Sequence, residues 1–145
     1  MITSIIVKLA LLLIWIVYSG LEGIREAIFY YYASSSRRKK IIEMHPMFAA
    51  QRGLIFATFS ALLWVAGYGW LVAVISFFGY AGIFSFIHDG AFFTTYNKLD
   101  STIYKKQWFD YSTTSTSVMD KFLTPVNRTI LAVVGLALII TSLFI

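Results

Sequence analysis

The chain has 145 residues, of which 59% are hydrophobic and only 13% charged, and its mean hydropathy is +0.75. A soluble domain is roughly 45–50% apolar with about a quarter of its residues charged, so this composition indicates one integral membrane domain. The absence of cysteine excludes disulfides, thiol catalysis and cysteine-ligated metal centres. The net charge of +5 is interpreted as a topology signal and as contact with lipid head groups, with no nucleic acid as a partner.

Four apolar runs predict an all-α fold, an integral membrane four-helix bundle that forms a single transmembrane domain over residues 1–145. No basic segment precedes the first run and no small-residue cleavage site follows it, so it is interpreted as a membrane helix and not as a signal peptide. Pro46 suits the first turn of the second run. An uncharged turn, Ala66 to Gly69, follows that run. The runs cover about residues 5–33, 47–66, 70–93 and 128–145.

The two longer connections, residues 34–46 and 94–127, hold nearly all of the basic residues, whereas the opposite side holds only Lys8. Because basic loops stay in the cytoplasm, we expect both connections to be cytoplasmic and both termini to lie outside. The expected location is a bacterial cytoplasmic membrane. The basic residues of the two connections are Arg37, Arg38, Lys39, Lys40, Lys98, Lys105, Lys106, Lys121 and, at the end of the second, Arg128.

Small residues recur at helical spacing in the later runs and predict close helix packing within the membrane. The sequence leaves open whether the neighbouring helix belongs to the same chain or to another subunit. The expected partners are therefore membrane lipids together with further copies of the chain, as a homo-oligomer, or the other subunits of a membrane complex. The small residues are Ala49, Gly53, Ala57 and Ala61 in the second run, Gly79 and Gly82 in the third, and Gly135 in the fourth.

Ionisable residues interrupt three of the four runs at a similar distance from the predicted cytoplasmic side. Each charge at such a depth costs about 2.5–3.5 kcal/mol on insertion scales, so these groups are expected to face inward and to pair. Three acids against two arginines leave a formal charge of −1, which a protonated histidine, a proton or a bound cation would balance. The residues are Glu22, Arg25, Glu26, Arg52, His88 and Asp89.

Two interpretations of this polar layer stay open. In the structural one, the charges only pair and fix the register of the helices. In the functional one, the layer binds a ligand or handles ions or protons, in a protein that acts alone or as a subunit of a larger complex. No cofactor can be named, and no metal site is expected because Arg25 lies between the two glutamates and would repel a cation.

A small membrane-embedded enzyme acting on a lipid or another amphiphile is the alternative function. Glu26 or His88 would then serve as the general base, and Arg52 with Arg25 would hold a phosphate or carboxylate of the substrate. No nucleophile motif and no phosphate-binding glycine loop accompanies these residues.

The predicted topology is tested by reporter fusions. A reporter fused after Ile145 should read as non-cytoplasmic, whereas the same reporter inserted between Arg38 and Lys39 should read as cytoplasmic. The inverse pattern would contradict the predicted orientation.

Overall fold

The computed structural model describes residues 2–33, 45–102 and 122–145. The central residues of both predicted loops, 34–44 and 103–121, lie outside the described part of the chain. Four described helices are each long and apolar enough to cross a membrane, which confirms the predicted all-α membrane bundle. They are α1 (Ile2–Tyr32), α3 (His45–Leu63), α4 (Trp70–Leu99) and α6 (Pro125–Leu143).

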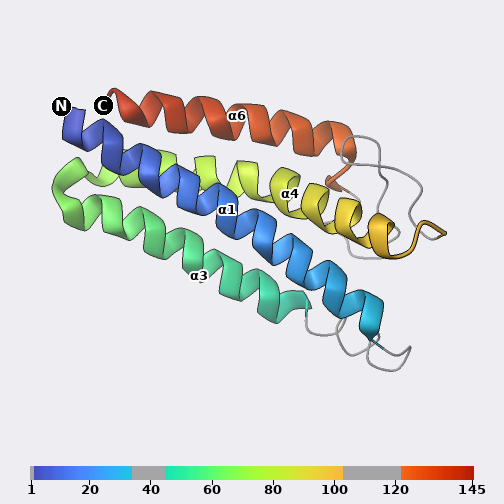
Figure 1. Cartoon of the computed structure of the whole chain (residues 1–145). Helices are drawn as coiled ribbons and strands as arrows, with labels where there is room; N and C mark the ends of the chain where they lie inside the picture. Colours follow the sequence, from blue (N-terminus) through green and yellow to red (C-terminus); the bar gives the residue numbers. More distant parts are fainter. Residues whose placement is uncertain (1, 34–44, 103–121) are drawn as a thin grey trace.

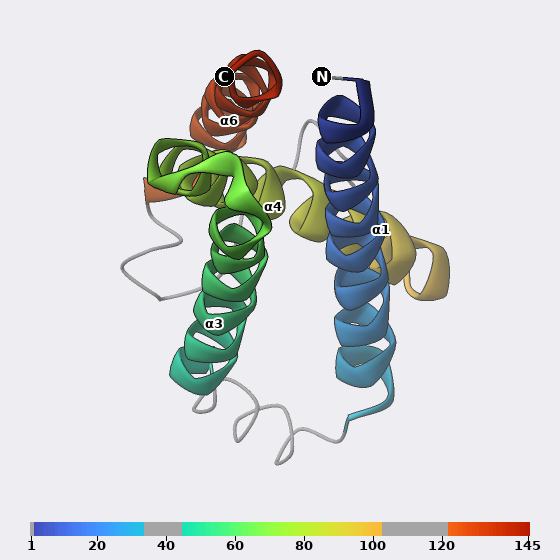
Figure 2. The same cartoon turned by 90° about the vertical axis from the view of Figure 1, so that its left-hand side faces the viewer.

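The four helices run roughly side by side, so that the bundle has two distinct ends (Figure 1). The two termini of the chain lie at one end, together with the turn between α3 and α4, and this end is called the turn end (Figures 1 and 2). The other end, where α1 and α4 finish and α3 and α6 begin, is called the loop end. Both termini therefore lie on one side of the bundle, as an even number of spans requires.

A π-helical turn, η1 (Trp64–Tyr68), reverses the chain between α3 and α4 at the turn end. Gly67 and Gly69 there have φ angles of 85° and 86°. Residues with a Cβ adopt these angles only with strain, so the two glycines permit the reversal. The turn lies where the sequence places it, and Trp64 and Trp70 are exposed on its two sides.

Helix α4 is the centre of the bundle, since it packs against α1, α6 and α3. It continues to Leu99, beyond the expected end of its span at Phe93. The extension follows from its buried aromatic side chains, because Phe93 and Tyr96 are 7% and 4% exposed and the Tyr96 ring lies 6.1 Å from that of Tyr31 in α1. The polar threonines of this segment thus belong to a helix that is held by ring packing on one face.

Helices α4 and α6 touch backbone to backbone at Gly79, Gly82 and Gly135, which confirms the predicted role of these glycines in helix packing. A Cβ on Gly135 would lie 2.6 Å from the carbonyl oxygen of Gly79, and one on Gly82 would lie 2.6 Å from that of Leu131. The stripe of small residues in α3 differs, because nothing lies within 4 Å of a Cβ on Gly53, and Ala57 and Ala61 are exposed.

Trp15 occupies the middle of the bundle and is fully buried. Its indole Nε1 donates a hydrogen bond to the backbone carbonyl of Tyr80, at 3.1 Å, so the ring joins α1 to α4. Five further rings from α1, α3 and α4 lie within 6 Å of the Trp15 ring and form with it the Trp15 cluster. They belong to Tyr18, Phe56, Phe59, Tyr80 and Phe84.

Lys8 is buried near the turn end, although the sequence suggested only a charge on the outer side. Its Nζ donates to the backbone carbonyl of Ser142 at 2.6 Å and lies 5.1 Å from the centre of the Tyr68 ring. A cation is favourable beside the last carbonyls of a helix, so Lys8 fastens α1 to the end of α6.

Gly135, which lies against the backbone of α4, and Gly53, beside which a Cβ would meet nothing, together give a test of the packing. Gly135→Ala forces a methyl group against the backbone of α4, and we expect a loss of about 1–3 kcal/mol in the free energy of unfolding. Gly53→Ala, the matched control, adds its methyl group to open space and is expected to leave stability unchanged or raised by up to about 1 kcal/mol. Equilibrium unfolding in mixed micelles, followed by circular dichroism, measures both, and an equal response would contradict the α4–α6 contact.

Candidate functional site

The six residues of the predicted polar layer come together in the half of the bundle nearest the loop end. Helix α1 contributes Glu22, Arg25 and Glu26, helix α3 contributes Arg52, and helix α4 contributes His88 and Asp89. Hydrogen bonds and ion pairs connect all six into one network. The i, i+4 spacing of Glu22 and Glu26 directs both carboxylates to one face of α1.

The centre of the network is the carboxylate of Glu26. Its Oε2 lies 2.7 Å from Nη2 of Arg52 and 2.9 Å from Nε2 of His88, so one oxygen joins α1, α3 and α4. The ring of Phe84 stacks on that of His88 with centroids 5.0 Å apart, and the Arg52 guanidinium lies 5.3 Å from the centre of the same ring. The side chains of His88 and Arg52 therefore pack directly against the Trp15 cluster, to which Phe84 belongs.

The network continues through the second nitrogen of His88 into α6. Nδ1 of His88 lies 2.7 Å from Oδ1 of Asp89, and Oδ2 of Asp89 lies 3.0 Å from Nη2 of Arg128. Ser85 also donates its hydroxyl to Oδ2 of Asp89, at 3.2 Å. All four described membrane helices thus contribute a charged side chain to one connected set.

Arg128 is the member that the sequence analysis missed, since it was assigned to the end of a basic loop. Helix α6 begins three residues earlier, at Pro125, with Thr124 as its N-cap, so Arg128 lies inside the first turn and is only 2% exposed. A threonine followed by proline is a common helix start, and this signal was present in the sequence. With Arg128 included, three arginines balance the three acids, and the formal charge is zero with neutral His88 instead of the −1 expected.

Arg25 is the most exposed member of the network. Its Nη2 lies 2.6 Å from Oε1 of Glu22, but its side chain is 64% exposed, whereas the expectation was that these charges face inward. Glu22 also lies near Arg52, with 3.8 Å between Oε1 and Nη2. The pair formed by Arg25 and Glu22 therefore marks the edge of the network on the side of α3.

Gly23 brings α1 close enough to α4 for these contacts to form. A Cβ at this position would overlap the backbone carbonyl oxygen of His88 and would lie 3.1 Å from the backbone nitrogen of Phe92. The absence of a side chain thus sets the distance between Glu26 and His88. Gly23 lies between the two glutamates in the sequence, and this position was the signal from which its role in helix packing could have been predicted.

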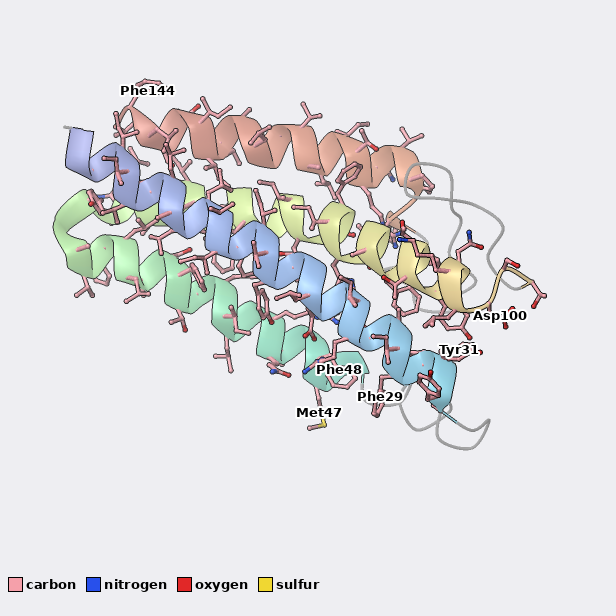
Figure 3. All side chains as sticks on the ribbon, viewed as in Figure 1. Phe29, Tyr31, Met47, Phe48, Asp100 and Phe144 are labelled. Carbon is pink, nitrogen blue, oxygen red and sulfur yellow. The ribbon has the colours of Figure 1, made fainter. Side chains whose placement is uncertain are left out.

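The network opens into a pocket between α1 and α3, two helices that make few direct contacts. The pocket has a volume of about 300 Å³. Phe29 and Phe48 lie near each other between the two helices toward the loop end, while the neighbouring Met47 points away (Figure 3). The residues that line the pocket are Glu22, Arg25, Glu26, Phe29, Phe48 and Arg52.

Aromatic side chains enclose the network on both sides along the bundle axis. The Trp15 cluster lies toward the turn end. Toward the loop end, the ring of Tyr30 packs on that of Phe92 at 5.8 Å, and Tyr31 packs on Tyr96. Because both ring layers join α1 to α4, the network is covered where these helices meet and reaches the pocket where α1 and α3 diverge.

The comparisons with known proteins give no match that would assign a function to the site. No protein-family model, no curated protein and no solved structure matches the chain. Within residues 2–33, 45–102 and 122–145, no three histidine, aspartate or glutamate side chains are placed to hold one metal ion. The donor set is instead one of arginines and carboxylates, which suits polar recognition of an organic group.

The pair formed by Asp89 and Arg128 gives a test of the network. Arg128→Met leaves the partly buried Asp89 without its arginine, and we expect a loss of up to about 3–5 kcal/mol in the free energy of unfolding, the range for a buried pair. The double variant with Asp89→Asn should lose less than the sum of the two single variants, with a coupling of about 0.5–3 kcal/mol. Lys98→Met, at an exposed position of α4, is the control and should change little; strict additivity would contradict the pairing.

Proposed function

We propose that this membrane protein binds a lipid-soluble ligand in the pocket between α1 and α3, and that the ionic network is the recognition site. The observation that carries the proposal is the meeting of charged and aromatic side chains in one pocket of about 300 Å³. A pocket that combines apolar walls with a few convergent polar groups is typical of small-molecule sites. This function concerns binding and requires no chemical step.

The position of the arginines supports binding over a purely structural role. A cluster that served only to fix helix register needs each of its buried charges to be fully paired, since an uncompensated buried charge is strongly destabilising. Here the Arg25 side chain is 64% exposed and Arg52 also lines the pocket. Among the described residues, moreover, no group accepts a hydrogen bond from the buried Nε of Arg52.

The arrangement of the helices supports entry of the ligand from the lipid. Helices α1 and α3 make few direct contacts, and Phe29 is 59% exposed beside the pocket. In the predicted topology the loop end is cytoplasmic, so the ligand would enter from the cytoplasmic leaflet. Assembly with further copies or other subunits stays a prediction, for which the exposed Ala57 and Ala61 offer a packing surface.

The other two functions receive less support from the described residues. A proton pathway across the membrane needs polar groups on both sides of the network, but the Trp15 cluster lies between the network and the turn end. For an enzyme, Glu26 lines the pocket as the candidate general base, but its carboxylate is already held by Arg52 and His88, and no hydroxyl or thiol nucleophile is among the lining residues. His88 lies behind Glu26 and is not among them.

The absence of native cysteine allows a direct test, because each single-cysteine variant then reports one position. The Phe48→Cys variant is modified with benzyl methanethiosulfonate, which adds an aromatic group inside the pocket. The Met47→Cys variant, modified in the same way, is the matched control, since Met47 points away from α1 (Figure 3). Native mass spectrometry then measures the small molecules that each protein retains from its own membrane.

We expect the unmodified protein and the modified Met47→Cys variant to retain a discrete added mass that the modified Phe48→Cys variant loses. The reason is that the benzyl group occupies the volume required by the ligand. Equal retention by the two modified variants, or no retained molecule in the unmodified protein, would contradict binding in this pocket.

A further inference from the structure

We infer that the ligand is an amphiphile whose head group is an anionic oxyacid, either a carboxylate or a phosphate, held by Arg52 and Arg25. This inference rests on the proposed function and specifies the class of ligand. The apolar part of the amphiphile would lie against Phe29 and Phe48. Three features of the pocket carry the inference: the spare donors of its arginines, the charge of the network, and the size of the cavity.

Among the described residues, the guanidinium of Arg52 has at least one donor without a hydrogen-bond partner. Its contacts with Glu22, Glu26 and His88 all involve Nη2, although a guanidinium carries five N–H groups. Its Nε is buried and has no hydrogen-bond partner among the described residues. A carboxylate or phosphate accepts hydrogen bonds from two guanidinium nitrogens at once, so it satisfies such a side chain better than an alcohol or an amide does.

The charge of the network accommodates one anion when His88 is protonated. His88 has a carboxylate oxygen at each ring nitrogen, from Glu26 at 2.9 Å and from Asp89 at 2.7 Å. Both hydrogen bonds form together only when both ring nitrogens carry a proton, and Glu26 Oε2 then accepts from Arg52 and His88 together. A neutral ring instead accepts at Nε2 from Nη2 of Arg52, which lies 3.1 Å away. With the ring protonated, the three arginines and the ring exceed the three acids by one positive charge, which a singly charged anion neutralises; with the ring neutral, the network has no net charge.

The position of Arg25 favours the same class of ligand. Its guanidinium is held by Glu22 on one side and is otherwise 64% exposed at the pocket, so a ligand can reach it without breaking a buried pair. Long arginine side chains extend along apolar surfaces and place their charge at the polar edge. Arg25 and Arg52 thus provide an outer and an inner contact for one head group.

The volume of the pocket limits how much of the amphiphile it encloses. A volume of about 300 Å³ lies at the small end of the range of small-molecule pockets. The pocket therefore encloses a head group and the first part of one chain, while the remaining chain stays among the lipids. Free inorganic phosphate has the same charged group but lacks the apolar part that Phe29 and Phe48 would contact.

The test uses the full chain in nanodiscs of phosphatidylcholine and oleoyl probes that differ only in the head group. Oleate and oleoyl lysophosphatidate are the anionic probes, and mono-oleoylglycerol is the neutral one. Each is titrated against the labelling of the Phe48→Cys variant by a maleimide, and inorganic phosphate is titrated in parallel. We expect the anionic probes to protect the cysteine at concentrations at least about tenfold lower than the neutral probe, because a charged hydrogen bond contributes about 1.5–3 kcal/mol.

Variants in the same cysteine background assign the effect to the arginines. Arg52→Lys keeps the charge beside Glu26, and with it the fold, but removes the paired donors, so the affinity for oleate should fall about tenfold. Arg25→Gln, at an exposed position, should lower it several-fold. Lys98→Gln removes a charge at the loop end away from the pocket and should leave it unchanged, which controls for attraction to the protein surface.

The outcomes separate this inference from the proposed function. Equal protection by the neutral and anionic probes would overturn the anionic class but leave a lipid-soluble ligand in the pocket. Protection by inorganic phosphate as strong as by lysophosphatidate would overturn the amphiphile. Protection of the cysteine by none of the probes would overturn the inference, and the retained mass in the benzyl experiment would then decide the proposed function by itself.

Discussion

The chain of charges from Arg52 through Glu26, His88 and Asp89 to Arg128 is the constraint on which the bundle depends. Apolar helices in lipid gain little from burying more apolar surface, so hydrophobicity alone does not define which faces meet. A charged group in the same solvent is costly unless it finds its partner. Since each described membrane helix contributes at least one member, pairing requires all four helices to adopt one mutual rotation and one register.

The packing of the uncharged residues follows from this requirement. The carboxylate of Glu26 reaches His88 only because Gly23 lets α1 lie against the backbone of α4. Arg128 reaches Asp89 because the glycines of α4 and α6 allow a similarly close approach about two to three turns away. The bulky rings then fill the remaining space on either side of the charges. Trp15 is the clearest example, since it is fully buried and its one polar atom is hydrogen-bonded.

The sequence predicted the fold and most members of the network because both depend on local patterns. Four apolar runs suffice for four helices, and residues at i, i+4 spacing, such as Glu22 and Glu26, must share a face. Arg128 was missed because its role depends on where α6 begins, and helix ends are the least certain part of such a prediction. The pocket could not be predicted from the sequence for a different reason. The separation of α1 and α3 results from how both helices pack on α4, and no spacing of residues within one helix encodes that packing.

The network is closed at one edge and open at the other, and this asymmetry reconciles its structural and functional interpretations. Arg128, at the α6 edge, has a side chain 3% exposed, whereas Arg25, at the edge toward α3, is 64% exposed. Arg128 is buried and pairs with the partly buried carboxylate of Asp89 away from the pocket, so the α4–α6 half serves to fix the helices. The half between α1 and α3 holds the same kind of charges beside an opening. The pairs that fix the fold therefore also hold Arg52 in place for a ligand, and rigid support of this kind is what precise polar recognition requires.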